Sequence, residues 1–150
     1  ISHDLFQGYR YLDRQEEQPQ FPFGFGLSYT EFSLQGVQVE RSVDRFHFNV
    51  TVTNSGEVTG AVVPQLYVSY PGSSVVRAVK ELKGFGRVEL TPGEKVDMEI
   101  EVTDEALCYY DPDDGWTLEA CRYEFHIGLS AAELLLESSW SFSGEDWQPE

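Results

Sequence analysis

From residue 31 onward, hydrophobic and polar residues alternate with a period of two, which is typical of β-strands with one buried and one solvated face. The clearest run is residues 46–53, FHFNVTVT, in which apolar and polar side chains take turns. Residues 95–102 repeat the pattern, with Val, Met, Ile and Val on one face. Turn signals follow or precede these runs, Asn-Ser-Gly at 54–56 and Thr-Pro-Gly at 91–93.

Other short apolar runs complete the set of predicted strands. They cover residues 62–70, 85–90, 116–118, 123–129 and 140–142. Residues 131–136 are interpreted as a loop. Short strands about ten residues apart, separated by Gly and Pro turns, predict an all-β antiparallel sandwich. We assign it to residues 30–143 and expect the polar tail, residues 144–150, to fray.

The first 20 residues have a different character. An apolar, aromatic group surrounds Gly8 and Arg10, and residues 13–20 are polar. Such a piece is too small to form a core of its own. It is interpreted as the last strand of another folded body, followed by a loop.

Residues 21–30, FPFGFGLSYT, combine aromatic side chains with helix- and strand-breaking residues. Pro22 fixes its own φ and biases the preceding residue towards an extended conformation. Gly24 and Gly26 allow backbone angles closed to other residues. The segment predicts a stiff connector between two packed bodies, with an N-terminal bulged strand as the alternative. The predicted docking residues are Phe21, Pro22, Phe23, Gly24, Phe25, Gly26, Leu27 and Tyr29. In isolation, the exposed phenylalanines are expected to cause self-association or to fold back on the sandwich.

The composition narrows the classes of molecule that this chain can bind. The chain has 150 residues, 41% of them hydrophobic, which predicts a packed core, and a formal net charge of −16. That charge argues against binding nucleic acid or an anionic membrane surface. The apolar runs are too short for a transmembrane helix. No signal peptide is visible, and because the chain opens on Ile1 the natural start is expected to lie upstream or to have been removed.

Two modification sites are suggested. Cys108 and Cys121 could form a disulfide between neighbouring strands in a secreted protein, or remain two buried thiols in a reducing compartment. Without clustered histidines they do not form a zinc site of the usual type. Asn49-Val50-Thr51 matches a glycosylation acceptor, and strand alternation directs Asn49 outward.

Candidate catalytic groups are sparse. The densest carboxylate group, DPDDG at residues 111–115, lacks the ligand spacing of a calcium-binding loop and is interpreted as an acidic hairpin turn.

Of the histidines, His47 falls on the wet face of a strand, His126 among core positions and His3 in the N-terminal piece. No serine or cysteine stands at triad spacing from them. Several aromatic residues could stack on sugar rings; Trp116 and Trp140 are instead expected in the core. The stacking candidates are Tyr109, Tyr110, Trp116, Trp140 and Trp147.

Several motifs together resemble one family. GYRY at 8–11 and FPFGFGLSYT at 21–30 resemble the junction in the family 3 glycoside hydrolases, the β-glucosidases and their relatives. VTNSG, QLYV, KELKGF and LTPGE, beginning at residues 52, 65, 80 and 90, resemble the C-terminal fibronectin type III-like domain of that family in order and spacing. Two positions depart from it: Cys121 stands where the family has Gly, which hints at a bridge to Cys108, and Pro64 places its strand at a sheet edge or on the N–H-free side.

The resemblance implies a fibronectin-III/immunoglobulin-like sandwich with an N-terminal arm, residues 1–29, trailing from a preceding α/β domain. In the family the aspartate nucleophile comes from an N-terminal barrel, within Ser-Asp-Trp, and the acid/base group from the middle domain. Glu145-Asp146-Trp147 lacks the serine and is not assigned as a nucleophile. No catalytic residue, metal site or cofactor is therefore assigned to this chain, and alone it is expected to be inactive.

Three functions follow from this. The first is an accessory module whose partners are the catalytic domains of a parent β-glucosidase, with a loop at residues 70–79 reaching towards the aglycone side. The second is an autonomous module that binds a β-glucoside, a polysaccharide or another partner. The third, an autonomous enzyme, has the weakest support because no pair of catalytic carboxylates is evident.

Overall fold

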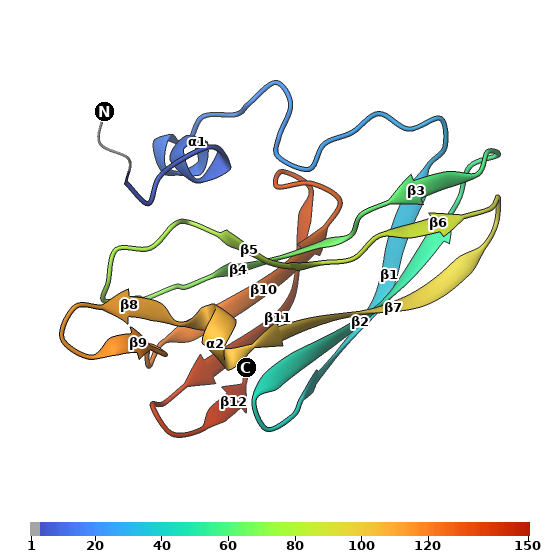
Figure 1. Ribbon diagram of the computed structural model, residues 1–150. Helices are drawn as coiled ribbons and strands as arrows, with labels where there is room; N and C mark the ends of the chain where they lie inside the picture. Colours follow the sequence, from blue (N-terminus) through green and yellow to red (C-terminus); the bar gives the residue numbers. More distant parts are fainter. Residues whose placement is uncertain (1–3) are drawn as a thin grey trace.

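The computed structural model of the protein describes residues 4–150. Two antiparallel sheets pack face to face (Figure 1). One sheet has three strands in the order β1-β2-β7, and the other has five in the order β12-β11-β10-β4-β5. Two short two-stranded ladders, β3-β6 and β8-β9, extend them. The predicted all-β sandwich is therefore confirmed.

Short strands are the main regular elements of residues 4–150, and two short helices accompany them. In chain order, these elements are α1 Tyr9–Gln15, β1 Phe32–Arg41, β2 Arg45–Asn54, β3 Gly60–Val62, β4 Gln65–Ser69, β5 Glu81–Phe85, β6 Val88–Leu90, β7 Lys95–Thr103, α2 Asp104–Leu107, β8 Tyr109–Asp111, β9 Gly115–Thr117, β10 Arg122–Gly128, β11 Leu134–Phe142 and β12 Trp147–Pro149. Among residues 4–150, none of the helices has the length and apolar character needed to cross a membrane.

The core forms where the alternating faces of the two sheets meet. Phe46 and Phe48 of β2 are fully buried, and their rings lie 4.8 and 5.0 Å from that of Phe125 in β10. Burial alternates along the whole of β2, as the period-two sequence predicts. Trp140 packs against this core, its ring 5.2 Å from that of Phe46, which confirms its predicted place.

Strand β4 does not alternate. Gln65 to Val68 are all buried, although β4 is an inner strand of a sheet with only one face on the core. Leu66 and Val68 belong to the core cluster. Tyr67 and Gln65 face the other way, towards the N-terminal arm. Pro64 stands just before β4, which is an inner strand, so the expectation that Pro64 places its strand at a sheet edge is wrong. The N–H that proline lacks is not needed there, because the pairing of β4 with both neighbours begins at Gln65.

Four local expectations were wrong. A helix, α1, occupies the piece interpreted as a trailing strand, because Tyr9 and Asp13 contact the sandwich at helical rather than strand spacing. The tail does not simply fray, since β12 pairs with β11. The residues interpreted as a loop at 131–136 include the start of β11. Trp116 is 71% exposed on a hairpin that projects beyond the core.

Candidate docking surface of the N-terminal arm

The N-terminal arm, residues 4–29 of the described chain, lies across the outer face and the β5 edge of the five-stranded sheet (Figure 1). Helix α1 makes the first contact. The Tyr9 hydroxyl accepts a hydrogen bond of 2.9 Å from the backbone N–H of Leu82 in β5. The Tyr9 ring stands edge-on to Tyr67 at 5.8 Å, which explains why Tyr67 is fully buried.

Two ion pairs flank this contact. Lys80 Nζ lies 2.7 Å from Asp13 Oδ1, and Arg10 lies 3.3 Å from Glu81. Burial alone would raise the pKa of Glu81, but Lys83, the Tyr70 hydroxyl and Arg10 outweigh it, so the pKa is lowered. Because the Lys80–Asp13 pair and Glu81 are largely shielded from solvent, they fix the arm more firmly than exposed pairs would.

The connector makes the second contact. The Phe23 carbonyl accepts a hydrogen bond of 2.8 Å from the Ala131 N–H, and its ring lies 5.3 Å from that of Tyr9. Phe25 N–H donates to the Pro22 carbonyl at 3.0 Å, closing a tight turn. Gly24 holds a φ of +82° in this turn, where type II geometry favours glycine.

Gln65 is the part of the sandwich on which the connector rests. Its Nε2 donates to the Leu129 carbonyl at 3.0 Å, and its Oε1 accepts from the Tyr67 hydroxyl at 2.6 Å. A Cβ built on Gly24 would overlap the Gln65 amide. The absence of a side chain at Gly24 is what lets the connector approach this closely.

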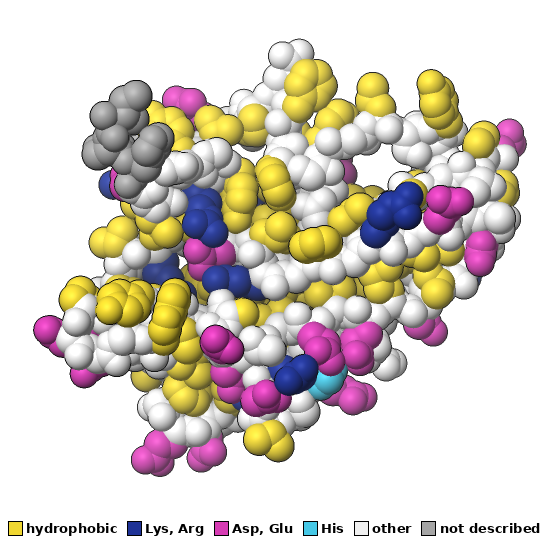
Figure 2. All heavy atoms as spheres, in the orientation of Figure 1, with side chains coloured by type: hydrophobic (Ala, Val, Ile, Leu, Met, Phe, Trp, Pro, Cys, Tyr) yellow, Lys and Arg dark blue, Asp and Glu magenta, His cyan; other side chains and the backbone are white. Residues whose placement is uncertain are grey.

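The other side of the connector is exposed. We call its five apolar side chains, Phe21, Phe23, Phe25, Leu27 and Tyr29, the apolar ridge. Leu27 and Tyr29 are 93% and 99% exposed, and the rings of Phe21 and Phe25 pair at 5.5 Å. A hollow of about 370 Å³ separates this stretch from β3 and is lined in part by Leu27 and Val62. Figure 2 shows hydrophobic side chains gathered along the top of the molecule, where Figure 1 draws the arm.

The arm therefore folds back on the sandwich through the Phe23 carbonyl and Gly24, whereas the rings of Phe21, Phe23 and Phe25 stay exposed. Contact of the predicted docking residues with another domain stays a prediction, as does the origin of the arm in a preceding domain. His3 lies outside the described residues.

The loop between β4 and β5, residues 70–79, is held in place by a residue that sequence reasoning missed. Glu119 is only 8% exposed. Its carboxylate accepts hydrogen bonds from Ser73 Oγ at 2.6 Å and from the Ser74 N–H at 2.6 Å. Burial would raise its pKa, but these bonds and the Arg77 charge lower it. Arg77, whose Nε lies 3.6 Å from Glu119, stacks over Tyr70 with its Cζ 3.9 Å from the ring centroid.

The hairpin of β8 and β9 carries the acidic turn. Asp111 Oδ1 accepts hydrogen bonds from the N–H groups of Asp113 and Asp114, and Gly115 has a φ of +80°, so the predicted hairpin turn is confirmed. Tyr110 and Trp116 stand exposed on it with their rings 5.7 Å apart. Trp147, by contrast, is half-buried against the core.

The remaining candidates are scattered. Cys108 and Cys121 are free thiols in this structure, and burial raises the pKa of each. A disulfide between them stays a prediction. Asn49 lies on the outward face of β2, as expected. His126 was misplaced among core positions, because it faces outward between Phe125 and Ile127 and bonds to Ser69 Oγ at 2.8 Å.

Comparison with known proteins agrees with this architecture. Residues 62–131 match the fibronectin type III-like domain model. A β-glucosidase of Kluyveromyces marxianus is 42% identical over 136 residues, which are 88% of this chain and 16% of that protein. The thermostable β-glucosidase B of Acetivibrio thermocellus is 39% identical over 90% of the chain and 18% of its own length.

Solved structures give the same picture. The crystal structure of the Bifidobacterium adolescentis GH3 β-glucosidase superposes with a TM-score of 0.87 and 34% identity, over 93% of this chain and 21% of that one. The chain thus spans about a fifth or less of the length of these relatives. It belongs to the fibronectin type III-like domains of the glycoside hydrolase family 3 β-glucosidases.

Proposed function

We propose that this domain braces the catalytic domains of a family 3 glycosidase through the apolar ridge, and that the parent enzyme hydrolyses terminal β-D-glucosyl residues. The substrate class rests on the β-glucosidases to which the chain is similar. The domain itself contributes binding surface rather than catalytic groups.

The two-sided arm is the observation that carries the proposal. One side is fixed to the sandwich by Tyr9, Asp13 and the Phe23 carbonyl. The other side presents five apolar side chains to solvent over a stretch of nine residues. A contiguous apolar patch held in a defined shape is typical of a surface that packs on another protein. Fixing it beforehand lowers the entropy cost of binding.

The test uses the full-length enzyme with Leu27→Ser, and Val43→Ser as the matched control. The Leu27 and Val43 side chains are both more than nine-tenths exposed in the domain, and Val43 lies in the distant β1–β2 turn. If Leu27 is buried between domains, the substitution should lower the melting temperature of the full enzyme, because burying one such side chain is worth about 2 kcal/mol. Equal effects of the two variants would refute bracing through the ridge.

A second arm of the test uses this chain directly. It is purified and assayed on an aryl β-glucoside alone and after mixing with the remaining portion of the enzyme. We expect no hydrolysis alone and a gain on mixing. Hydrolysis by the chain alone would overturn the assignment.

The loop at residues 70–79 is proposed to reach towards the aglycone side of the parent's active site. Its anchoring to Glu119 supports this, because the exposed tip, with Val76 77% exposed, is carried on an ordered base. In the full enzyme, Val76→Asp should change KM for a disaccharide more than for an aryl glucoside, while Val43→Asp should change neither. Unchanged kinetics on both substrates would refute the role.

A second candidate function is binding of a polysaccharide, favoured by the exposed Tyr110–Trp116 pair next to three aspartates. The chain would then pellet with cellulose or β-glucan, and Trp116→Ala would abolish this while Tyr11→Ala, an exposed aromatic elsewhere, would not. Failure of the unmodified chain to pellet would remove this function.

A further inference from the structure

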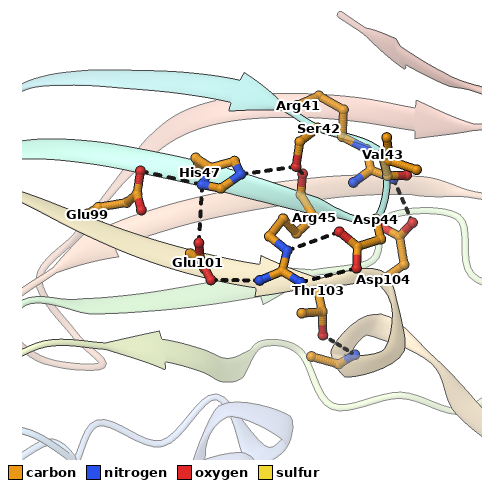
Figure 3. A network of polar contacts seen from close by, with 11 residues as sticks. Arg41, Ser42, Val43, Asp44, Arg45, His47, Glu99, Glu101, Thr103 and Asp104 are labelled. Atoms are coloured by element: carbon orange, nitrogen blue, oxygen red, sulfur yellow. Dashed lines mark hydrogen bonds and ion pairs between the residues drawn. The ribbon is translucent and has the colours of Figure 1, made fainter.

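One imidazole and two carboxylates converge on the outer face of the three-stranded sheet (Figure 3). His47 of β2 is paired in register with Glu101 of β7, and Glu99 stands two residues earlier on the same face. His47 Nδ1 lies 3.4 Å from Glu99 Oε2 and 3.4 Å from Glu101 Oε1. The three donor atoms all lie within 4.8 Å of one another.

The His47 imidazole is oriented by a contact of its second ring nitrogen, Nε2, with Ser42. His47 Nε2 lies 3.0 Å from Ser42 Oγ, and that hydroxyl donates to the Arg45 carbonyl at 3.3 Å. In the tautomer that carries its proton on Nε2, His47 donates to Ser42 Oγ and turns the Nδ1 lone pair towards both carboxylates, which is the form that binds a cation. Three acceptors then meet at one point, and a cation satisfies all of them.

Arg45 orients one of the carboxylates. Its Nη1 lies 3.0 Å from Glu101 Oε2, so Oε1 is the oxygen left facing His47. The same guanidinium is shared with Asp44, with Nε 3.0 Å from Oδ1. Two of the three potential ligands thus have a hydrogen-bonding partner that fixes their direction, which is the arrangement that surrounds metal ligands in proteins.

We propose that His47, Glu99 and Glu101 bind one Zn²⁺ ion. A tetrahedral ion with bonds of about 2.1 Å holds its ligand atoms about 3.4 Å apart. The two nitrogen–oxygen distances have this value, so the ion fits with little movement of the side chains. The nitrogen ligand favours Zn²⁺ over Ca²⁺ and Mg²⁺, which take oxygen ligands and need six or more of them.

The ion would link two neighbouring strands and is structural in this respect. His47 is 23% exposed and the two glutamates 48% and 42%, so the ion is reachable from solvent and a water completes the tetrahedron. Figure 2 shows Asp and Glu side chains gathered on the lower part of the molecule, away from the arm. The negative charge of this face raises the local concentration of cations.

The test is calorimetric titration of the whole chain with ZnCl₂, using Glu99→Gln and Glu40→Gln as a matched pair. Glu40 of β1 pairs in register with His47 and is exposed, so its substitution removes the same charge beside the same histidine. It is not one of the three ligands. Titrations with CaCl₂ and MgCl₂ test the choice of metal, and imidazole resonances in NMR spectra report which histidine responds.

We expect one Zn²⁺ per chain, a shift of the His47 imidazole signals, and a loss of affinity of about tenfold or more in Glu99→Gln. Glu40→Gln should change affinity much less, and Ser42→Ala should weaken binding by releasing the ring. Three results would overturn the site: equal loss in both glutamine variants, equal binding of Ca²⁺ and Zn²⁺, or Zn²⁺ binding that leaves the His47 signals in place.

Discussion

Gly24→Ala should release the arm from the sandwich. Gly24 sits at a φ of +82°, and a side chain in the left-handed region costs about 1–2 kcal/mol. The new methyl group would also overlap the Gln65 amide. That amide is not free to move aside, because it bonds to both the Leu129 carbonyl and the Tyr67 hydroxyl.

The magnitude follows from these contacts. Displacing Gln65 breaks one buried and one partly buried hydrogen bond, each worth about 1 kcal/mol. Together with the backbone cost, the docked arm loses about 3 kcal/mol relative to the free arm. Since about 1.4 kcal/mol is a factor of ten in an equilibrium constant, undocking should become about a hundredfold more frequent.

Amide hydrogen exchange at Ala131 measures this directly, because that N–H donates to the Phe23 carbonyl of the arm. We expect exchange about a hundredfold faster in Gly24→Ala, and faster exchange at Leu82, whose N–H donates to Tyr9. Gly26→Ala is the matched control, since no atom lies within 4 Å of a Cβ built there. If Ala131 exchanges equally fast in the two variants, the close approach of Gly24 to Gln65 does not hold the arm.

Three other predictions concern the sandwich. Trp147→Ala should lower the free energy of unfolding in urea by about 2–3 kcal/mol, because the ring packs on core aromatics. Trp116→Ala, at an exposed ring, should lower it by under about 0.5 kcal/mol. Equal losses in the two variants would mean that the packing of Trp147 in β12 does not stabilise the domain. Glu119→Gln should cost about 1–3 kcal/mol, since an amide nitrogen cannot accept the hydrogen bonds that one carboxylate oxygen now accepts, and proteolysis of the 70–79 loop should become faster. Acidification should destabilise the domain in two steps. Burial lowers the folded pKa of His126, so the unfolded state binds more protons below about pH 6.5; the lowered pKa of Glu119 acts in the same direction below about pH 4.5. Urea midpoints measured from pH 8 to 3 check this, and His126→Gln should remove the first step.

The strands and the core were predictable because their signal is local. Burial in β2 follows the side-chain period of the strand itself, so Phe46 and Phe48 could be placed inward from the sequence. The type of fold followed from the number and spacing of such runs. No partner residue had to be known.

Features that depend on distant partners were not predictable in this way. Trp147 lies in a polar tail, and its burial comes from the free edge of β11 and the nearby core aromatics. Glu119 carries no local signal, since its partners Ser73 and Ser74 precede it by 46 and 45 residues. The prediction for Trp116 failed for the opposite reason. A large aromatic side chain is usually buried, but the hairpin that carries Trp116 extends past the core.

The arm combines both kinds of information. Its sequence predicted the connector and the exposed aromatic side chains, but not the helix or the side that would face the sandwich. That side is decided by β5, an edge strand of the five-stranded sheet. An edge strand exposes unpaired backbone groups, and covering them prevents association with other chains. Tyr9 covers this edge by accepting from Leu82, so the contact that protects the sheet also fixes the apolar ridge. The two roles are therefore linked: whatever loosens the arm exposes the edge of the sheet and disorders the ridge at the same time.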